Sequence, residues 1–194
     1  MKITPTILEG VFLIENFNSS DDRGEFIKTF HKRNFEDSSL NLDIRESYFS
    51  ISHKNVIRGM HFQLPPHDHN KMVYVAKGEI LDIVLDLRKK SATYKQYIIV
   101  QLSDKNKTSI YIPKGMAHGF MSLEANTITV YNVTTEYEPD SDFGINVNSF
   151  GYNWEINKPI ISDRDNEFMN LEDFDLQNPF WMNKKIIVTG GTGF

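Results

Sequence analysis

The sequence predicts an all-β fold, a sandwich or barrel with only a few short helices. Short segments rich in β-branched and aromatic residues follow one another along the chain, and turn signals separate them. Few of the intervening stretches have a helical pattern. The chain has 194 residues, of which 40% are hydrophobic and 24% charged, so we expect one domain with a full apolar core.

The expected strands occupy much of the chain up to residue 134. They lie at residues 10–15, 25–31, 44–52, 72–77, 80–87, 96–102, 107–112 and 127–134. In the segment 80–87, Asp82 and Asp86 alternate with apolar residues, a period of two that is typical of a strand. Turns are expected at residues 78–79, 104–106 and 113–115, which contain Gly, Asn, Asp or Pro. Weak helical patterns occur only at residues 32–40 and 166–174.

The composition excludes several classes of function. The absence of cysteine rules out disulfides, thiolate catalysis and zinc–sulfur sites. A net charge of −5 argues against general binding to nucleic acid or to a membrane surface. No apolar run approaches the roughly 18 residues that a membrane span needs, and the N-terminus lacks the pattern of a signal peptide. We therefore expect a soluble cytoplasmic protein.

Three segments concentrate reactive side chains among apolar residues: 58–63 (RGMHFQ), 112–120 (IPKGMAHGF) and 129–134 (TVYNVT). Each also has a simpler structural interpretation. A histidine among apolar residues is more often a hydrogen-bonded core group than a catalyst. Tyr131 in a strand is ordinarily a packing aromatic with its hydroxyl at the rim. The three segments are therefore informative only in combination.

Together these segments resemble the dTDP-4-dehydrorhamnose 3,5-epimerase family. The resemblance runs from about residue 10 to about residue 170 and is strongest in R-G-x-H-F-Q at 58–63 and I-P-x-G-x-A-H-G-F at 112–120. Tyr131 followed by Y-E-P at 137–139, D-R-G-E-F at 22–26 and P-I-I-S-D-R-D at 159–165 extend it. The resemblance implies a cupin-like double-stranded β-helix, or jelly-roll, barrel over residues 1–181. It also implies an isomerase that needs no cofactor.

The substrates of this family are nucleoside-diphosphate 4-keto-6-deoxy sugars, whose C4 ketone acidifies the protons on C3 and C5. Inversion needs a base, a group that stabilises the enolate oxygen, and an acid on the other face of the ring. By resemblance His61 is the base and Asp165 orients it. Lys71 stabilises the enolate oxygen, and Tyr131 is the acid.

The resemblance also suggests how the substrate is held. His118 would line the sugar pocket, and Gln63 of the first motif would contact the substrate. Arg58 and Arg23 would bind the diphosphate, because a guanidinium matches two phosphate oxygens at once. The family forms dimers in which an N-terminal strand joins the partner's sheet, so Arg23 and Phe26 are expected near the neighbour's site. We accordingly expect a homodimer.

The sequence departs from the family at two of the expected binding positions. Glu46 and Tyr48 stand where the rhamnose-pathway enzymes usually carry Gln and Asn that help to hold the nucleotide or sugar. We therefore expect both residues at the substrate, and the nucleobase and the sugar stay open. Which of C3 and C5 is inverted also stays open.

Several other interpretations compete with these assignments. Asp165 follows Ser162 at the spacing of a helix cap, and Lys71 could be a solvated charge on a strand. His67 and His69 form an H-x-H pair like that of metal-binding cupins, but no glutamate follows and Lys71 would repel a cation, so we expect no metal. A sugar-nucleotide 3,4-ketoisomerase and a non-catalytic sugar-nucleotide-binding cupin are the alternative functions.

The last residues, 182–194, do not continue the β pattern. Their sequence resembles the first strand and glycine-rich turn of an extended short-chain dehydrogenase, with Thr189, Gly190 and Gly193 matching T-G-x-x-G. The alternative is a simple glycine-rich tail. The resemblance suggests a fusion, or a gene overlap, with a reductase of that type. We expect this segment to be disordered or held by a neighbouring chain, and to contribute nothing to the epimerase site.

Overall fold

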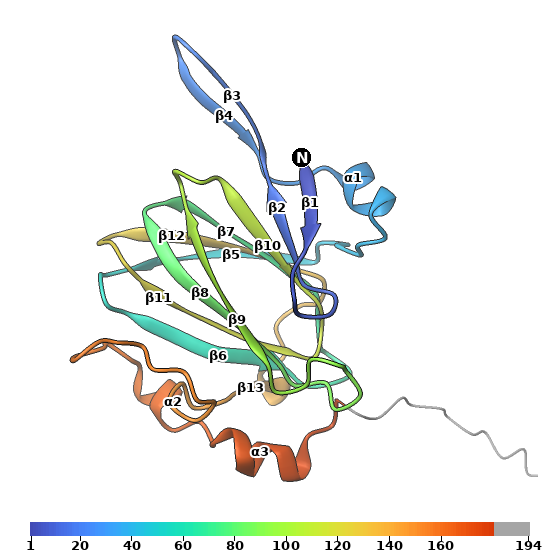
Figure 1. Cartoon of the computed structure of the whole chain (residues 1–194), viewed down its shortest axis with the longest axis vertical. Helices are drawn as coiled ribbons and strands as arrows, with labels where there is room; N and C mark the ends of the chain where they lie inside the picture. Colours follow the sequence, from blue (N-terminus) through green and yellow to red (C-terminus); the bar gives the residue numbers. More distant parts are fainter. Residues whose placement is uncertain (181–194) are drawn as a thin grey trace, which may run out of the picture.

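The computed structural model describes residues 1–180 and consists mainly of two β-sheets that face each other (Figure 1). The six-stranded sheet has the order β1 (Lys2–Pro5), β2 (Phe12–Glu15), β10 (Thr108–Ile112), β7 (Lys71–Lys77), β12 (Thr127–Val133) and β5 (Glu46–Ser52). The five-stranded sheet has the order β13 (Asp142–Gly144), β6 (Ile57–Gln63), β11 (Met116–Ser122), β8 (Glu79–Asp86) and β9 (Tyr97–Ser103). The strand pairings within both sheets are antiparallel, and the predicted cupin-like jelly-roll fold is confirmed.

The apolar core has two main parts. One lies between the sheets and includes Val73, Val84 and Phe120, which are almost completely buried. The other lies between the five-stranded sheet and the C-terminal segment, where Phe62 packs edge-on against Phe174 with ring centroids 5.1 Å apart. Because the C-terminal segment covers the outer face of this sheet, β8 is buried on both of its faces.

The expected strands are confirmed with small changes at their ends. The segment 25–31 is shorter than expected: β4 (Gly24–Lys28) is an exposed strand that forms a two-stranded hairpin with β3 (Phe17–Asp21). In Figure 1 this hairpin projects away from the body of the molecule. Short strands β1, β3 and β13 were not expected from the sequence.

The helices are α1 (Lys32–Asp37), α2 (Asp163–Asn166) and α3 (Leu171–Gln177), with a 3₁₀ turn at Pro139–Ser141. The helix expected at 166–174 is wrong as a single element, since the structure divides it into α2 and α3. Phe168 lies in the break and packs on Gly144, where any β-carbon would come within 2.2 Å of its ring. The packing of this ring therefore outweighs the local helical pattern.

The two motif strands, β6 and β11, lie side by side and bring His61 opposite His118 in the register. Gly59 has φ +147°, and a β-carbon there would lie 2.5 Å from the Cα of Gly119. Both glycines are therefore needed for the strands to approach so closely. This contact explains one glycine of each motif by packing rather than by chemistry.

No helix among residues 1–180 is long and apolar enough to cross a membrane. The expectations for the segment 182–194 fall outside the described residues.

Candidate active site

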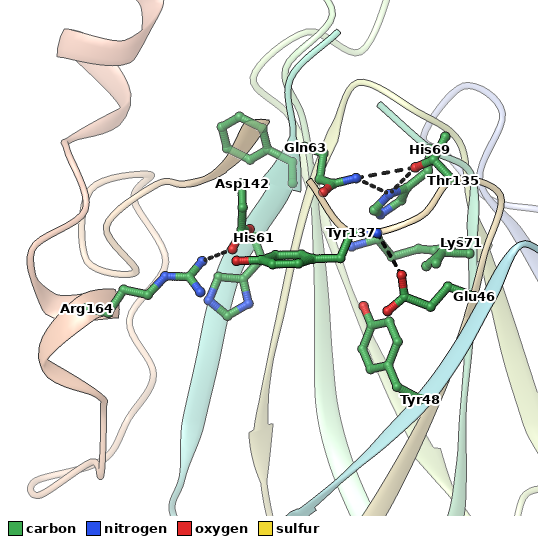
Figure 2. Close-up of a pocket in the computed structure, with 12 residues that line it drawn as sticks. Glu46, Tyr48, His61, Gln63, His69, Lys71, Thr135, Tyr137, Asp142 and Arg164 are labelled. Atoms are coloured by element: carbon green, nitrogen blue, oxygen red, sulfur yellow. Dashed lines mark hydrogen bonds and ion pairs between the residues drawn. The ribbon is translucent and has the colours of Figure 1, made fainter. Parts of the chain in front are cut away.

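The candidate site is a cavity that opens between the two sheets. Two adjoining hollows of about 270 and 200 Å³ share Tyr48, His61 and Lys71 as lining residues. The outer hollow is drawn in Figure 2, where Arg164 and Asp142 lie at one side and Glu46 and Tyr48 at the other. The inner one is lined by Tyr48, Ser50, Arg58, His61, Lys71, His118, Phe120 and Tyr131.

His61 and Asp165 form a hydrogen-bonded pair at the wall made by β6 and α2. The Nε2 atom of His61 lies 2.9 Å from Oδ1 of Asp165, and the other carboxylate oxygen accepts a hydrogen bond from the backbone N–H of Gly59 at 3.1 Å. Burial raises the pKa of Asp165, but the hydrogen bond and charge of His61 and the further hydrogen bonds outweigh it, so its pKa is lowered. Asp165 is therefore an ionised acceptor, and it fixes the orientation of the imidazole.

The helix-cap interpretation of this segment is also confirmed. The Oγ of Ser162 accepts a hydrogen bond from the backbone N–H of Asp165 at 3.2 Å, which begins α2. The cap uses the backbone of Asp165 and leaves its carboxylate free to reach His61. The two interpretations were thus compatible.

Tyr131 comes from β12 in the opposite sheet and faces the same cavity. Its hydroxyl lies 3.2 Å from Oγ of Ser50, and its ring stacks on Tyr48 at 4.8 Å between centroids and 19° between planes. Burial raises the pKa of Tyr131, so the phenol stays protonated at neutral pH. A proton donor therefore lies across the cavity from His61.

Lys71 and His118 lie deeper in the cavity. Lys71 is only 6% exposed, which excludes the interpretation as a solvated charge. Burial lowers the pKa of Lys71 to about 8, although the charges of Asp82 and Asp142 act in the opposite direction. The Nε2 atom of His118 lies 2.7 Å from Oδ2 of Asp82.

The other expected binding residues differ in their positions. Arg58 lines the inner hollow and donates from Nε to Oγ of Ser52 at 3.1 Å. Glu46 lines the outer hollow and accepts a hydrogen bond from the backbone N–H of Tyr137 at 2.7 Å. Gln63 also lines it, but both ends of its amide are bound to the chain.

The Oε1 atom of Gln63 accepts from the N–H of Glu138 at 2.7 Å, and Nε2 donates to the carbonyls of His67 and Glu136 at 2.9 and 3.2 Å. Through these hydrogen bonds, Gln63 connects the two loops that contain His67 and residues 136–138 at the rim of the cavity. Arg23 and Phe26 lie on the β3–β4 hairpin and do not line this cavity within their own chain.

Asp142, Arg164 and His69 are further lining residues of the cavity, beyond the site residues expected from the sequence. Arg164 forms an ion pair with Asp142, with 2.8 Å between Nη2 and Oδ2, and both line the outer hollow. Arg164 belongs to the motif at 159–165 and His69 to the H-x-H pair, so the sequence contained a signal for both; Asp142 carried none. Among residues 1–180 the structure contains no cluster of three His, Asp, Glu or Cys side chains able to hold a metal ion.

Comparison with known proteins identifies the family. The sequence profile described as dTDP-4-dehydrorhamnose 3,5-epimerase matches residues 5–173. The chain belongs to this family. The protein of that name from Methanothermobacter thermautotrophicus is 36% identical over 91% of this chain and 96% of its own length. The chain is accordingly an epimerase, an enzyme of the isomerase class.

Solved structures of epimerases have the same fold. The Legionella pneumophila enzyme, solved in complex with dTDP-4-keto-L-rhamnose, matches with a TM-score of 0.85 and 32% identity over 91% of this chain and 95% of that one. ChmJ from Streptomyces bikiniensis, a 3'-monoepimerase solved with dTDP-quinovose, matches with a TM-score of 0.85 and 26% identity, covering 90% of both chains.

Proposed function

We propose that the epimerase acts on a dTDP-linked 4-keto-6-deoxy sugar and inverts C3 and C5 through an enolate. The observation that carries the assignment is the His61–Asp165 pair on one wall of the cavity with Tyr131 on the other. Because Nε2 of His61 donates to Asp165, Nδ1 is free to take the proton from carbon. Tyr131 then delivers a proton to the opposite face of the ring.

The remaining groups stabilise the charge that develops. The Lys71 ammonium would face the C4 oxygen, where negative charge appears when the proton leaves C3 or C5. Arg58 in the inner hollow and Arg164 in the outer one would hold the diphosphate, with His118, Glu46 and Tyr48 around the sugar and nucleoside. No cofactor is needed, because proton transfer alone completes the reaction.

Incubation with the 4-keto-6-deoxy sugar nucleotide in heavy water tests this proposal. Deuterium at C3 and C5 with inversion of both centres is expected, and NMR of the product detects both. Exchange and inversion at C3 alone would assign the activity of a 3'-monoepimerase, as in ChmJ. A carbonyl moved to C3 would instead identify a ketoisomerase, and the absence of exchange would identify a binding protein.

We further propose a homodimer in which the β3–β4 hairpin reaches the partner. The hairpin exposes Phe17 and Phe26, 48% and 58% of whose surfaces are accessible, and the edge strand β5 exposes Phe49 at 64% and Ile51 at 57%. A second copy would cover these apolar side chains and pair the open edge. Arg23 and Phe26 would then lie beside the partner's substrate.

The cellular context is inferred on separate grounds. We propose a cytoplasmic enzyme, because sugar nucleotides are charged and soluble substrates. The resemblance of residues 184–194 to the start of a short-chain dehydrogenase suggests a fused or neighbouring reductase that takes up the keto product. Co-purification of NADPH-dependent reduction of this product with the native protein would support the association.

A further inference from the structure

The interior of the barrel contains a carboxylate that the reaction scheme above does not use. Asp82, at the centre of β8, is 0% exposed. Its Oδ2 atom pairs with Nε2 of His118 at 2.7 Å, while Oδ1 is buried without a hydrogen-bond partner in the described part of the chain. A buried carboxylate of this kind needs a nearby positive charge or further donors to remain ionised.

Lys71 is the cation placed to provide that charge. Only 6% of its surface is exposed, and it lines both hollows. It takes part in none of the ion pairs found among residues 1–180. Burial lowers its pKa to about 8, and the two carboxylates that counteract this are Asp82 from β8 and Asp142 from β13. Asp142 already pairs with Arg164 at 2.8 Å, so Asp82 is the carboxylate without another cation.

The same carboxylate determines the hydrogen-bonding character of His118. Burial lowers the pKa of this imidazole more than Asp82 raises it, so the ring is neutral at pH 7. A neutral ring that donates from Nε2 to Asp82 leaves the lone pair on Nδ1. His118 lines the inner hollow beside Lys71, so an acceptor and a cation lie together there.

We propose that Asp82 is a positioning residue of the epimerase: its buried carboxylate fixes His118 as a hydrogen-bond acceptor toward the substrate and keeps the Lys71 ammonium charged beside the C4 oxygen. The inference rests on the proposed role of Lys71 at the enolate. The other titratable or charged groups that line the two hollows with Lys71 are Glu46 and Tyr48 from β5, Arg58 and His61 from β6, His69 from the loop before β7, His118 from β11, Tyr131 from β12, Tyr137, Asp142 from β13 and Arg164 from α2. Burial lowers the pKa of His69 to about 3, so this ring stays neutral over the relevant pH range.

The test compares Asp82→Asn with Asp165→Asn, which removes the carboxylate of the other histidine pair. NMR of the free protein follows the Lys71 side chain and the ring nitrogens of His118 from pH 6 to pH 10. In Asp82→Asn we expect the Lys71 midpoint to fall by roughly one pH unit or more, and the fixed protonation of His118 at Nε2 to be lost. Asp165→Asn should leave both unchanged.

Kinetics provide the second measurement. The turnover rate of the wild type should fall as pH rises through about 8, as Lys71 loses its proton. In Asp82→Asn this fall should move to lower pH by the same amount as the Lys71 midpoint. Asp82→Glu, which restores the charge, should return the fall toward its wild-type position. A carboxylate with a purely structural role would change stability and leave the pH profile in place.

The outcomes separate this inference from the proposed function. Unchanged Lys71 and His118 signals in folded Asp82→Asn would overturn the positioning role, whatever the activity. A wild type that exchanges no deuterium, or a Lys71→Met variant with full activity, would overturn the reaction scheme instead. If Asp82→Asn does not fold, the carboxyl carbon of Asp82 in the wild type decides, since its NMR shift must change with the titration of Lys71.

Discussion

At the scale of single residues, the proposed base and the proposed acid lie on two facing sheets. Asp165 gives His61 a fixed orientation from one side, and burial keeps the hydroxyl of Tyr131 protonated on the other. His61 and Tyr131 both line the cavity already, so neither side chain needs a large conformational change to reach a substrate there. This arrangement predicts that substitutions at the two walls have different effects on proton removal and proton return.

Substitution of the proposed base, His61, should abolish both exchange reactions. We expect His61→Asn to reduce deuterium exchange at C3 and C5 by roughly a hundredfold or more, because His61 is the proposed base, oriented by Asp165, and proton removal begins both exchange reactions. NMR of the sugar in heavy water measures both positions at once. His31→Asn, which changes an exposed histidine at the start of α1, is the matched control and should retain full exchange. Residual exchange at one carbon only would identify a second base.

Substitution of the proposed acid, Tyr131, should have a different effect. We expect Tyr131→Phe to retain part of the exchange and lose inversion, because proton removal by His61 persists while delivery to the opposite face does not. The ratio of inverted to exchanged product measures this. Tyr48→Phe keeps the stacked ring and removes a neighbouring hydroxyl that is not the proposed acid, so it should leave the ratio of inverted to exchanged product unchanged, whatever it does to substrate binding. Normal epimerisation by Tyr131→Phe would assign the acid to another group.

At the scale of secondary-structure elements, the approach of β6 to β11 holds the site in place. Gly59 precedes His61 by two residues and touches Gly119 through its backbone, while its N–H binds Asp165. The positions of His61 and of the carboxylate of Asp165 therefore depend on this one contact between strands.

A side chain at Gly59 should separate the two strands. Gly59→Ala should lower the free energy of unfolding by more than about 2 kcal/mol, because its β-carbon would overlap backbone that cannot move aside. Gly151→Ala is the matched control: Gly151 also has a positive φ, +86°, but nothing lies within 4 Å of the added carbon. The control should lose only about 1 kcal/mol in chemical denaturation. Equal losses in the two variants would mean that the contact with Gly119 is unimportant.

The sequence predicted the secondary-structure elements better than the contacts between residues that are far apart in the chain. The strands with β-branched and aromatic residues were identified because their local pattern is strong, and β3 was missed because FNSSD has little of it. The alternation of Asp82 and Asp86 with apolar residues indicated a strand. It did not indicate the hydrogen-bond partner of Asp82, since His118 is 36 residues away and contacts it only across the sheet. Arg164 was overlooked within a motif for the same reason: its partner Asp142 is close only in space.

At the scale of the whole molecule, the chain carries parts that its own cavity does not use. The β3–β4 hairpin lies outside the main sheets, and Arg23 on it forms an ion pair with the nearby Asp21. Only the family resemblance suggested a role for this hairpin in a dimer, because no local sequence pattern shows which surface a second copy would cover. The proposed dimer can therefore be tested by asking whether the hairpin of one chain contributes to the active site of the other.

If the hairpin acts on the partner's site, two defective chains should restore one another. Arg23→Ala damages the diphosphate contact contributed to the partner, and His61→Asn removes the base of its own site, so each variant alone should be nearly inactive. A mixed dimer has one site with both residues intact, and equal mixing should recover about a quarter of the wild-type activity. Mixing His61→Asn with Tyr131→Phe is the control. Each of these changes affects the cavity of the chain that carries it, so every site in the mixed dimer stays defective. Recovery in the control, no recovery in the first mixture, or a stable monomer at micromolar concentration would contradict the shared site. Light scattering during size-exclusion chromatography measures the last of these directly.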